Sequence, residues 1–277
     1  MFTVLNVECW EPKGSLRIWG RFLHNSMKYY YADNKNFKIG YLDYVARNGR
    51  VNWKKIGKRI SKEGGKVVYS GKEEVDPSAD FVPFVPVELR QRLCTNMALE
   101  VLDIMESVPK ELRVGLYDPT GDFASFVPFL LKYTDNMVVV TKNMKMYSAM
   151  AEEIISETGA MLRPVRCISA LGSCGFIIAP AVIKERFFPM PKAVVLTSVC
   201  PKVSLPCSVY YKYSFRLPKE LDSLRPQGTD AESFGGALYS LCNVYSIGSL
   251  VPFVCANHAD SQTTLSLKKY FEEKFGT

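Results

Sequence analysis

The residues best suited to bind a ligand lie in the loop YDPTGDF, residues 117–123, between an apolar run and a helical segment. In a doubly wound sheet, the loop after the first strand borders the ligand crevice. This loop combines carboxylates, a hydroxyl and a glycine, at Asp118, Thr120, Gly121 and Asp122. Because Asp122 directly precedes Phe123, we predict that it caps the next helix and accepts hydrogen bonds from the amides that would otherwise face an anion.

Other reactive residue types form no catalytic or metal-binding pattern in the sequence. The eight cysteines include no CxxC pair, and the two histidines are far apart, so the usual zinc spacings are absent and we predict no metal site. Equal spacings of the cysteine pairs 167/174 and 200/207 leave a four-thiolate site as an alternative to free buried thiols. If the protein is catalytic, Cys174 is the candidate nucleophile and His258 the candidate base.

Five apolar runs and two helical segments predict the elements that position the loop. Val, Ile and Leu without alternation are typical of strands covered on both faces, and such runs occupy residues 113–117, 137–141, 161–168, 176–179 and 193–197. Helices are predicted over 123–133 and over 144–158, the latter with Asn143 as its cap and Gly159 as its stop. We therefore expect an α/β, Rossmann-like fold, with a largely parallel sheet, its first run central, and helices on both faces.

The short connection between the third and fourth runs leaves the direction of the fourth strand open. Residues 169–175 span at most about 25 Å when extended. A return across two neighbouring strands needs roughly 20 Å at a strand spacing of about 4.8 Å. A parallel crossover without a long helix and an antiparallel pairing are both compatible with this length.

Two strand ends resemble those of a known family. The ending VVVTKN, residues 138–143, is similar to the second-strand end of NADP-linked shikimate dehydrogenase-like enzymes, and FIIAPAV, residues 176–182, resembles a fourth-strand end in NAD(P)-binding Rossmann domains. The resemblance covers residues 110–200. It implies NADP as the cofactor, with Lys142 on the 2′-phosphate, Thr141 or Asn143 on the ribose, and Ala179 on the nicotinamide side.

The loop departs from the family's G-x-G-x-x-G turn, which lets the backbone approach a pyrophosphate. It has only Gly121, beside Pro119, which has no amide donor, and the carboxylates of Asp118 and Asp122 stand where the ligand's charge would lie. We therefore expect a binding or regulatory module with a degenerate dinucleotide site. The alternatives are an NADP-linked oxidoreductase and a nucleic-acid-associated protein.

The nucleic-acid alternative depends on a basic helix predicted over residues 52–64, which is capped by Asn52 and carries its lysines opposite Trp53, Ile56 and Ile60. Eight cations and one acid between residues 47 and 66 account for the whole formal charge of +7. The lysines of such a helix either neutralise the phosphates of a nucleic acid or simply face the solvent. We favour the solvated face, because no aromatic residues for base stacking are interleaved with the lysines.

We expect two parts: an N-terminal α+β region over 1–85, and a Rossmann-like domain over 86–277, with its core at 106–200 and a C-terminal segment packed on it. The N-terminal part should contain strands at 3–10 and 16–22 and a hairpin of 29–31 with 37–45. Further expected elements are a helix over 87–107, a strand over 208–215, a capping box of Thr229 with Glu232, and a last helix over 265–274.

No apolar run approaches the roughly 18 residues that a membrane span needs. The first residues lack the basic start and apolar block of a secretory signal. We therefore expect a cytoplasmic protein without a membrane partner. A small molecule or nucleotide is the expected ligand, and no oligomeric state follows from the sequence.

Overall fold

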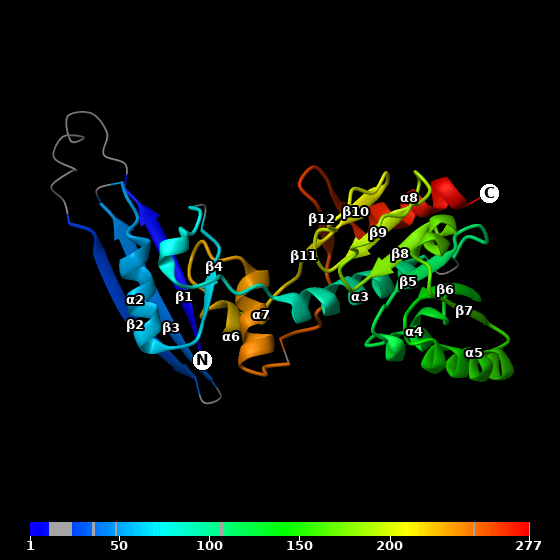
Figure 1. Ribbon diagram of the computed structural model, residues 1–277, viewed down its shortest axis with the longest axis horizontal. Coiled ribbons are helices and arrows are strands. Elements are labelled where there is room, and N and C mark those ends of the chain that lie inside the picture. The colour runs from blue at the N-terminus through cyan, green and yellow to red at the C-terminus, as the bar shows by residue number, and fades with distance from the viewer. Residues whose placement is uncertain are drawn as a thin grey trace. The chain divides into compact units, whose positions relative to one another are not determined.

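The computed structural model describes residues 1–10, 24–34, 37–47, 49–71, 73–105, 108–245 and 247–276. The chain forms two compact units (Figure 1). The N-terminal unit comprises Met1–Leu89 and Arg216–Ser249, and the sheet unit comprises Arg90–Phe215 and Leu250–Thr277.

Residues 216–249 belong to the N-terminal unit, whereas we expected them to pack on the Rossmann-like domain. The Phe234 ring, fully buried, meets the ring of Phe2 edge-on with centroids 6.0 Å apart. Gly236 lies so close to Pro86 that an added Cβ would be 2.1 Å from the proline Cβ. The segment thus completes the core of the N-terminal unit.

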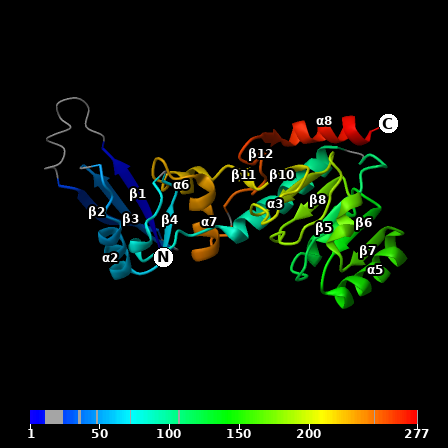
Figure 2. The same cartoon turned by 45° about the horizontal axis from the view of Figure 1, so that its top comes forward.

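The sheet unit contains six parallel strands, helices and a small antiparallel sheet (Figures 1 and 2). Its elements in chain order are α3 (Val87–Ile104, beginning in the N-terminal unit), β5 (Val114–Tyr117), the 3-10 helix η3 (Ala124–Phe126), α4 (Val127–Leu130), β6 (Asn136–Val140), α5 (Met144–Thr158), β7 (Met161–Val165), the 3-10 helix η4 (Ile168–Ser173), β8 (Phe176–Ala179), β9 (Val194–Thr197), β10 (Ser208–Tyr210), β11 (Lys212–Ser214), β12 (Val254–Ala256), β13 (Ser261–Thr263) and α8 (Thr264–Phe275).

The six-stranded sheet has the order β10-β9-β8-β5-β6-β7, and every pairing in it is parallel. Val114 of β5 pairs with Met137 on one side and Phe176 on the other, so the first apolar run is central, as predicted. Numbered from β5, this is the 3-2-1-4-5-6 order of doubly wound sheets. The predicted α/β fold is confirmed.

The open question of the fourth strand is settled as parallel. Residues 168–173 form η4, which lets the chain return from β7 and enter β8 beside β5. Gly115 makes this close return fit, because a Cβ there would be 2.6 Å from Leu171 Cδ2 and 2.9 Å from Cys174 Sγ.

The two predicted sheet helices have different outcomes. The helix over 144–158 is confirmed as α5, and it stops at Gly159 with φ 74°. The continuous helix over 123–133 is wrong, since the segment forms η3 and then a single turn, α4. Pro128 has no N–H to donate to the Ala124 carbonyl, so the α-helical ladder cannot run through this segment.

The C-terminal elements also differ from the expected ones in detail. The strand predicted over 208–215 divides at Tyr211, with β10 on the edge of the parallel sheet and β11 pairing antiparallel with β12. The last helix is confirmed as α8 (Figure 2). Its Phe271 packs against Phe176 of β8, with ring centroids 4.9 Å apart.

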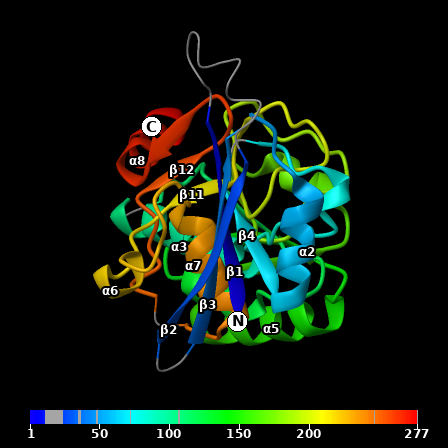
Figure 3. The same cartoon turned by 90° about the vertical axis from the view of Figure 1, so that its left-hand side faces the viewer.

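The N-terminal unit is a four-stranded sheet with the order β2-β3-β1-β4, and α2 and α7 lie on opposite sides of it (Figure 3). Its elements are β1 (Phe2–Cys9), β2 (Ser26–Asn34), β3 (Phe37–Ala46), α2 (Trp53–Glu63), β4 (Lys66–Tyr69), the 3-10 helix η2 (Pro77–Ala79), α6 (Lys219–Asp222) and α7 (Ala231–Leu241).

The hairpin β2-β3 and the basic helix α2 are confirmed, and Trp53, Ile56 and Ile60 are buried as predicted. The strand predicted at 16–22 lies outside the described residues. The capping box of Thr229 with Glu232 is replaced, since Asp230 is the N-cap of α7 and accepts from the Ser233 amide at 2.7 Å.

Candidate anion site at the carboxyl edge of the sheet

Asp118, the residue directly after β5, has the most complete hydrogen bonding in the candidate loop. Its Oδ1 accepts from the Gly121 amide at 2.9 Å. Its Oδ2 accepts from the Phe123 amide at 2.9 Å and from the Tyr147 hydroxyl of α5 at 2.6 Å. Asp118 is fully buried. The loop therefore encloses its own carboxylate where a Rossmann-like loop would offer amides to a phosphate.

Asp122 does not cap the helix at Phe123, so that prediction is wrong. Its exposed carboxylate accepts instead from the Thr120 hydroxyl at 2.7 Å. The Thr120 hydroxyl also lies 3.5 Å from Asp118 Oδ1. The loop amides bind Asp118 instead of Asp122 because of its position. Asp118 directly follows the central buried strand, and the Tyr147 hydroxyl holds its carboxylate next to those amides.

Gly121 allows the loop to approach Asn143 and Met146 closely. Its φ of 92° favours glycine, and a Cβ there would be 2.7 Å from Met146 Cε and 3.0 Å from Asn143 Nδ2. The Lys142 amide donates to the Pro119 carbonyl at 3.2 Å. The loop after β5 therefore lies against the turn between β6 and α5.

The three residues assigned to an NADP ribose and phosphate lie in that turn but differ in exposure. Thr141 is buried, and its Oγ1 accepts from the Asn143 amide at 3.0 Å. Lys142 and Asn143 are exposed, and the Asn143 side chain faces Met146 Sδ at 3.7 Å. Asn143 occupies the N-cap position of α5 without a side-chain capping bond.

Ala179, assigned to the nicotinamide side, is fully buried at the end of β8. The thiol of Cys94 on α3 lies beside it, with its pKa raised to about 12 by burial despite hydrogen bonds with Tyr213 and the Ala179 backbone. The Ser198 hydroxyl donates to the next carbonyl, that of Pro180, at 2.5 Å. Protein groups thus cover this strand end.

The electrostatics of the site centre on the Asp118–Tyr147 pair. The pKa of Tyr147 is raised, first by burial and then by its hydrogen bond and proximity to the Asp118 carboxylate. The phenol therefore stays protonated and acts as a donor at neutral pH. The arrangement stabilises a carboxylate, and it presents no base or nucleophile to a ligand.

The other two candidate reactive residues, Cys174 and His258, do not belong to this loop. Cys174 is buried and its pKa is raised to about 11, mainly by burial, which contradicts the alternative of an exposed nucleophile. His258 is exposed and meets the Tyr211 ring edge-on, with centroids 5.6 Å apart. Within the described ranges, no cluster of His, Cys, Asp and Glu has metal-binding geometry.

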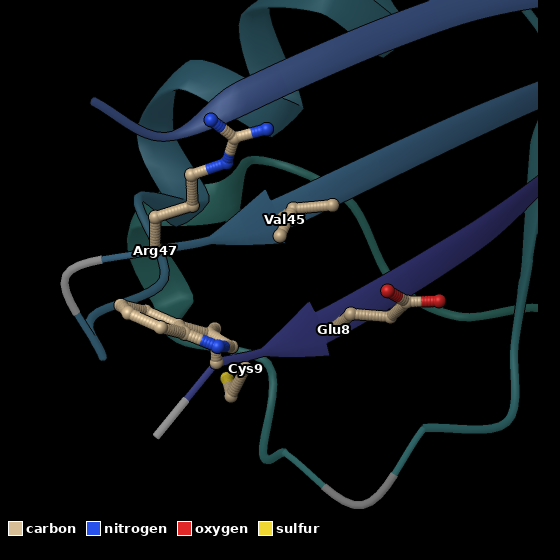
Figure 4. A pocket seen from close by; sticks show the side chains of 5 residues that line it. Glu8, Cys9, Val45 and Arg47 are labelled. Atoms are coloured by element: carbon tan, nitrogen blue, oxygen red, sulfur yellow. The ribbon is translucent and has the colours of Figure 1, made fainter. Parts of the chain in front are cut away.

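The N-terminal unit has cavities of its own. One of about 370 Å³ lies at the ends of β1 and β3 and is lined by Glu8, Cys9, Trp10, Val45 and Arg47 (Figure 4). A larger one, of about 620 Å³, follows the outer side of α2 and is lined by five of its cations.

No known protein-family model matches this chain, and neither does any curated protein sequence. Among the helices of the described residues, none is both long enough and apolar enough to cross a bilayer.

Proposed function

We propose that the sheet unit is a binding or regulatory module with a degenerate dinucleotide site, in which the Asp118 carboxylate stands in for a bound phosphate. The observation that carries this proposal is the set of three donors on Asp118: the amides of Gly121 and Phe123 and the hydroxyl of Tyr147. The first two are the backbone donors that a pyrophosphate would need.

The energetics oppose tight NADP binding. Hydrogen bonds to a charged group are worth about 1.5–3 kcal/mol each, and a pyrophosphate would have to replace Asp118 at its donors or bind beside a buried negative charge. Lys142 offers one exposed ion pair, worth at most about 1 kcal/mol. Micromolar affinity needs about 8 kcal/mol.

The competing proposal is an NADP-linked oxidoreductase. The place of Lys142 favours it, because this exposed lysine follows the strand next to β5, at the edge where doubly wound sheets bind nucleotides. In that case the loop would have to rearrange around the ligand and release Asp118.

Calorimetry on the full chain separates the two proposals, with NADP, NAD, S-adenosylmethionine and free nucleotides as ligands. If the sheet unit is a module with a degenerate site, the unmodified protein should not bind NADP with micromolar affinity. Asp118→Ala frees the two amides and removes one negative charge, so it should create measurable binding of NADP or inorganic phosphate.

Lys142→Ala has a matched control in Lys145→Ala, which removes the same charge from an exposed position three residues further along. Micromolar NADP binding by the unmodified chain that Lys142→Ala abolishes and Lys145→Ala preserves would overturn the module in favour of the oxidoreductase.

We also propose a cytoplasmic location. All eight cysteines fall in the described part of the chain, and none of them forms a disulfide there. Reduced thiols are typical of the cytoplasm. Fractionation of cells that produce the full-length protein tests this location.

A further inference from the structure

The outer side of α2 concentrates positive charge along a groove. The cavity of about 620 Å³ is lined by five cations and one acid, Asp80; the cations are Lys54, Lys55, Lys58, Arg59 and Lys62. Lys54, Lys58 and Lys62 follow one another at four-residue intervals, so they form a row about 5–6 Å apart along the helix. This spacing suits a ligand with repeated negative charges.

Within the part of the chain that the structure describes, the lysines of α2 form no stabilising ion pairs. Arg59 pairs with Glu63 at 2.9 Å, but among the described residues the four lysines have no ion-pair partner. Lys54 and Lys55 stand in the first turn of α2, which has no acidic residue, and there they oppose the positive end of the helix dipole. The arrangement favours an external anion.

A membrane surface is a poorer match for α2 than a soluble polyanion. An interfacial helix inserts its apolar face between lipids. The apolar face of α2 is already used, because Trp53, Ile56 and Ile60 are buried against the sheet of the N-terminal unit. Only the cationic face is open to a partner.

The structure also brings aromatic rings to the cations, which the linear sequence does not. The Arg59 guanidinium lies over the Tyr29 ring of β2, 5.0 Å from its centroid. The Lys38 ammonium of β3 lies 4.0 Å from the centroid of Tyr31, whose hydroxyl donates to Glu63. Tyr31 is 40% exposed, so part of its side chain remains accessible to a partner.

We propose that this surface, formed by the cations of α2 with Tyr29, Tyr31 and Lys38 and called the basic face below, binds single-stranded nucleic acid. Cations that track a phosphate backbone beside tyrosines on which bases stack are the two components of such sites. A duplex hides its bases from stacking, so the tyrosines favour a single strand. The inference is independent of the function proposed for the sheet unit.

Fluorescence anisotropy of the full chain with labelled single-stranded RNA, single-stranded DNA and a duplex of the same sequence tests the proposal, over a series of salt concentrations. Micromolar or tighter single-strand binding at low salt is expected. Each lost phosphate contact makes the slope of log K against log salt shallower by about 0.7 for a single strand, so Lys54→Gln/Lys58→Gln/Lys62→Gln should make it shallower by about 2.

The charge control is Lys110→Gln/Lys145→Gln/Lys269→Gln, which removes the same charge from exposed positions of the sheet unit. It should leave the affinity within about twofold if electrostatic attraction is local, as screening at a Debye length of about 8–10 Å implies. An equal loss in both triple variants overturns the proposed site.

The stacking control is Tyr30, which is also 40% exposed and also has a lysine over its ring, Lys28, but points to the opposite face of β2. Tyr31→Ala should weaken single-strand binding about tenfold, Tyr31→Phe should preserve it, and Tyr30→Ala should have little effect. Circular dichroism of each variant verifies the fold.

Three further outcomes overturn the inference: no single-strand binding at micromolar protein and low salt, equal binding of duplex and single strand with no effect of Tyr31→Ala, or binding to phosphatidylserine vesicles in the absence of binding to either nucleic acid.

Discussion

The Tyr147 hydroxyl donates a 2.6 Å hydrogen bond to Asp118 Oδ2, and both side chains are fully buried. This bond joins α5 to the end of the central strand. Because the same carboxylate accepts from two loop amides, the bond also sets the conformation of the loop at the sheet's carboxyl edge.

Tyr147→Phe should destabilise the protein by about 1.5–3 kcal/mol, because it removes one donor from a buried charged acceptor. Tyr133→Phe is the control: the Tyr133 hydroxyl donates to Asp103 at 2.7 Å, but at an exposed site, and its loss should cost about 0.5 kcal/mol or less. Urea unfolding measures both changes. Equal losses would contradict the role of burial at Asp118.

High pH should weaken the fold through Tyr147, whose pKa is raised above its ordinary 10.0. The folded protein keeps this proton at pH values at which the unfolded chain has released it. The stabilisation is therefore complete below about pH 10 and is lost as the pH rises above that value. Unfolding free energies measured on either side of pH 10 should fall less steeply in Tyr147→Phe, and identical slopes would refute the assignment.

Two asparagines at helix N-cap positions offer a paired test of capping. The Asn52 side chain accepts from the Lys55 amide at 2.9 Å, whereas the Asn143 side chain makes no capping bond. Asn52→Ala should cost about 1 kcal/mol, and Asn143→Ala should cost less. Hydrogen exchange of the first-turn amides in α2 and α5 reports each helix separately. A larger effect at Asn143 would show that the capping geometry is different.

Gly57→Ala should be strongly destabilising although alanine favours helices. An added Cβ at Gly57 of α2 would be 1.6 Å from the Ala79 carbonyl oxygen, so η2 and the helix would have to separate. We expect a loss of about 1–3 kcal/mol, as for overpacked cores. Ser61→Ala, at an exposed position one turn later, should change stability by about 0.5 kcal/mol or less. Thermal unfolding compares the two variants, and a stabilising Gly57→Ala would show that this contact is looser.

Lys54→Glu should separate stability from binding. Lys54 and Lys145 occupy the second positions of α2 and α5, and neither helix has an acid in its first turn. Either residue changed to Glu should stabilise its helix by about 0.3–1 kcal/mol through the helix dipole. Only Lys54→Glu should reduce single-strand binding in the anisotropy assay. A parallel loss in Lys145→Glu would rule out a local site on the basic face.

The candidate site shows how local and tertiary information divide. From the sequence, both carboxylates are placed in the correct loop, but the loop amides are predicted to donate to Asp122, which is their near neighbour in the chain. The choice of Asp118 depends on Tyr147, which is 29 residues away in the chain. A contact of that separation leaves no local signal, so only the folded chain reveals which carboxylate is enclosed.

The sequence by itself predicted the apolar strands of a largely parallel sheet, the central place of the first run, α5 with its stop at Gly159, and the amphipathic α2, because apolar runs, apolar periodicity and glycine stops are visible in the local sequence. Only the tertiary structure decided the parallel return through η4, the place of residues 216–249 in the N-terminal unit, and the proximity of Tyr31 to the lysines of α2. Those features arise where strands and helices distant in sequence pack together, and the side chains that meet there are selected by the shared core.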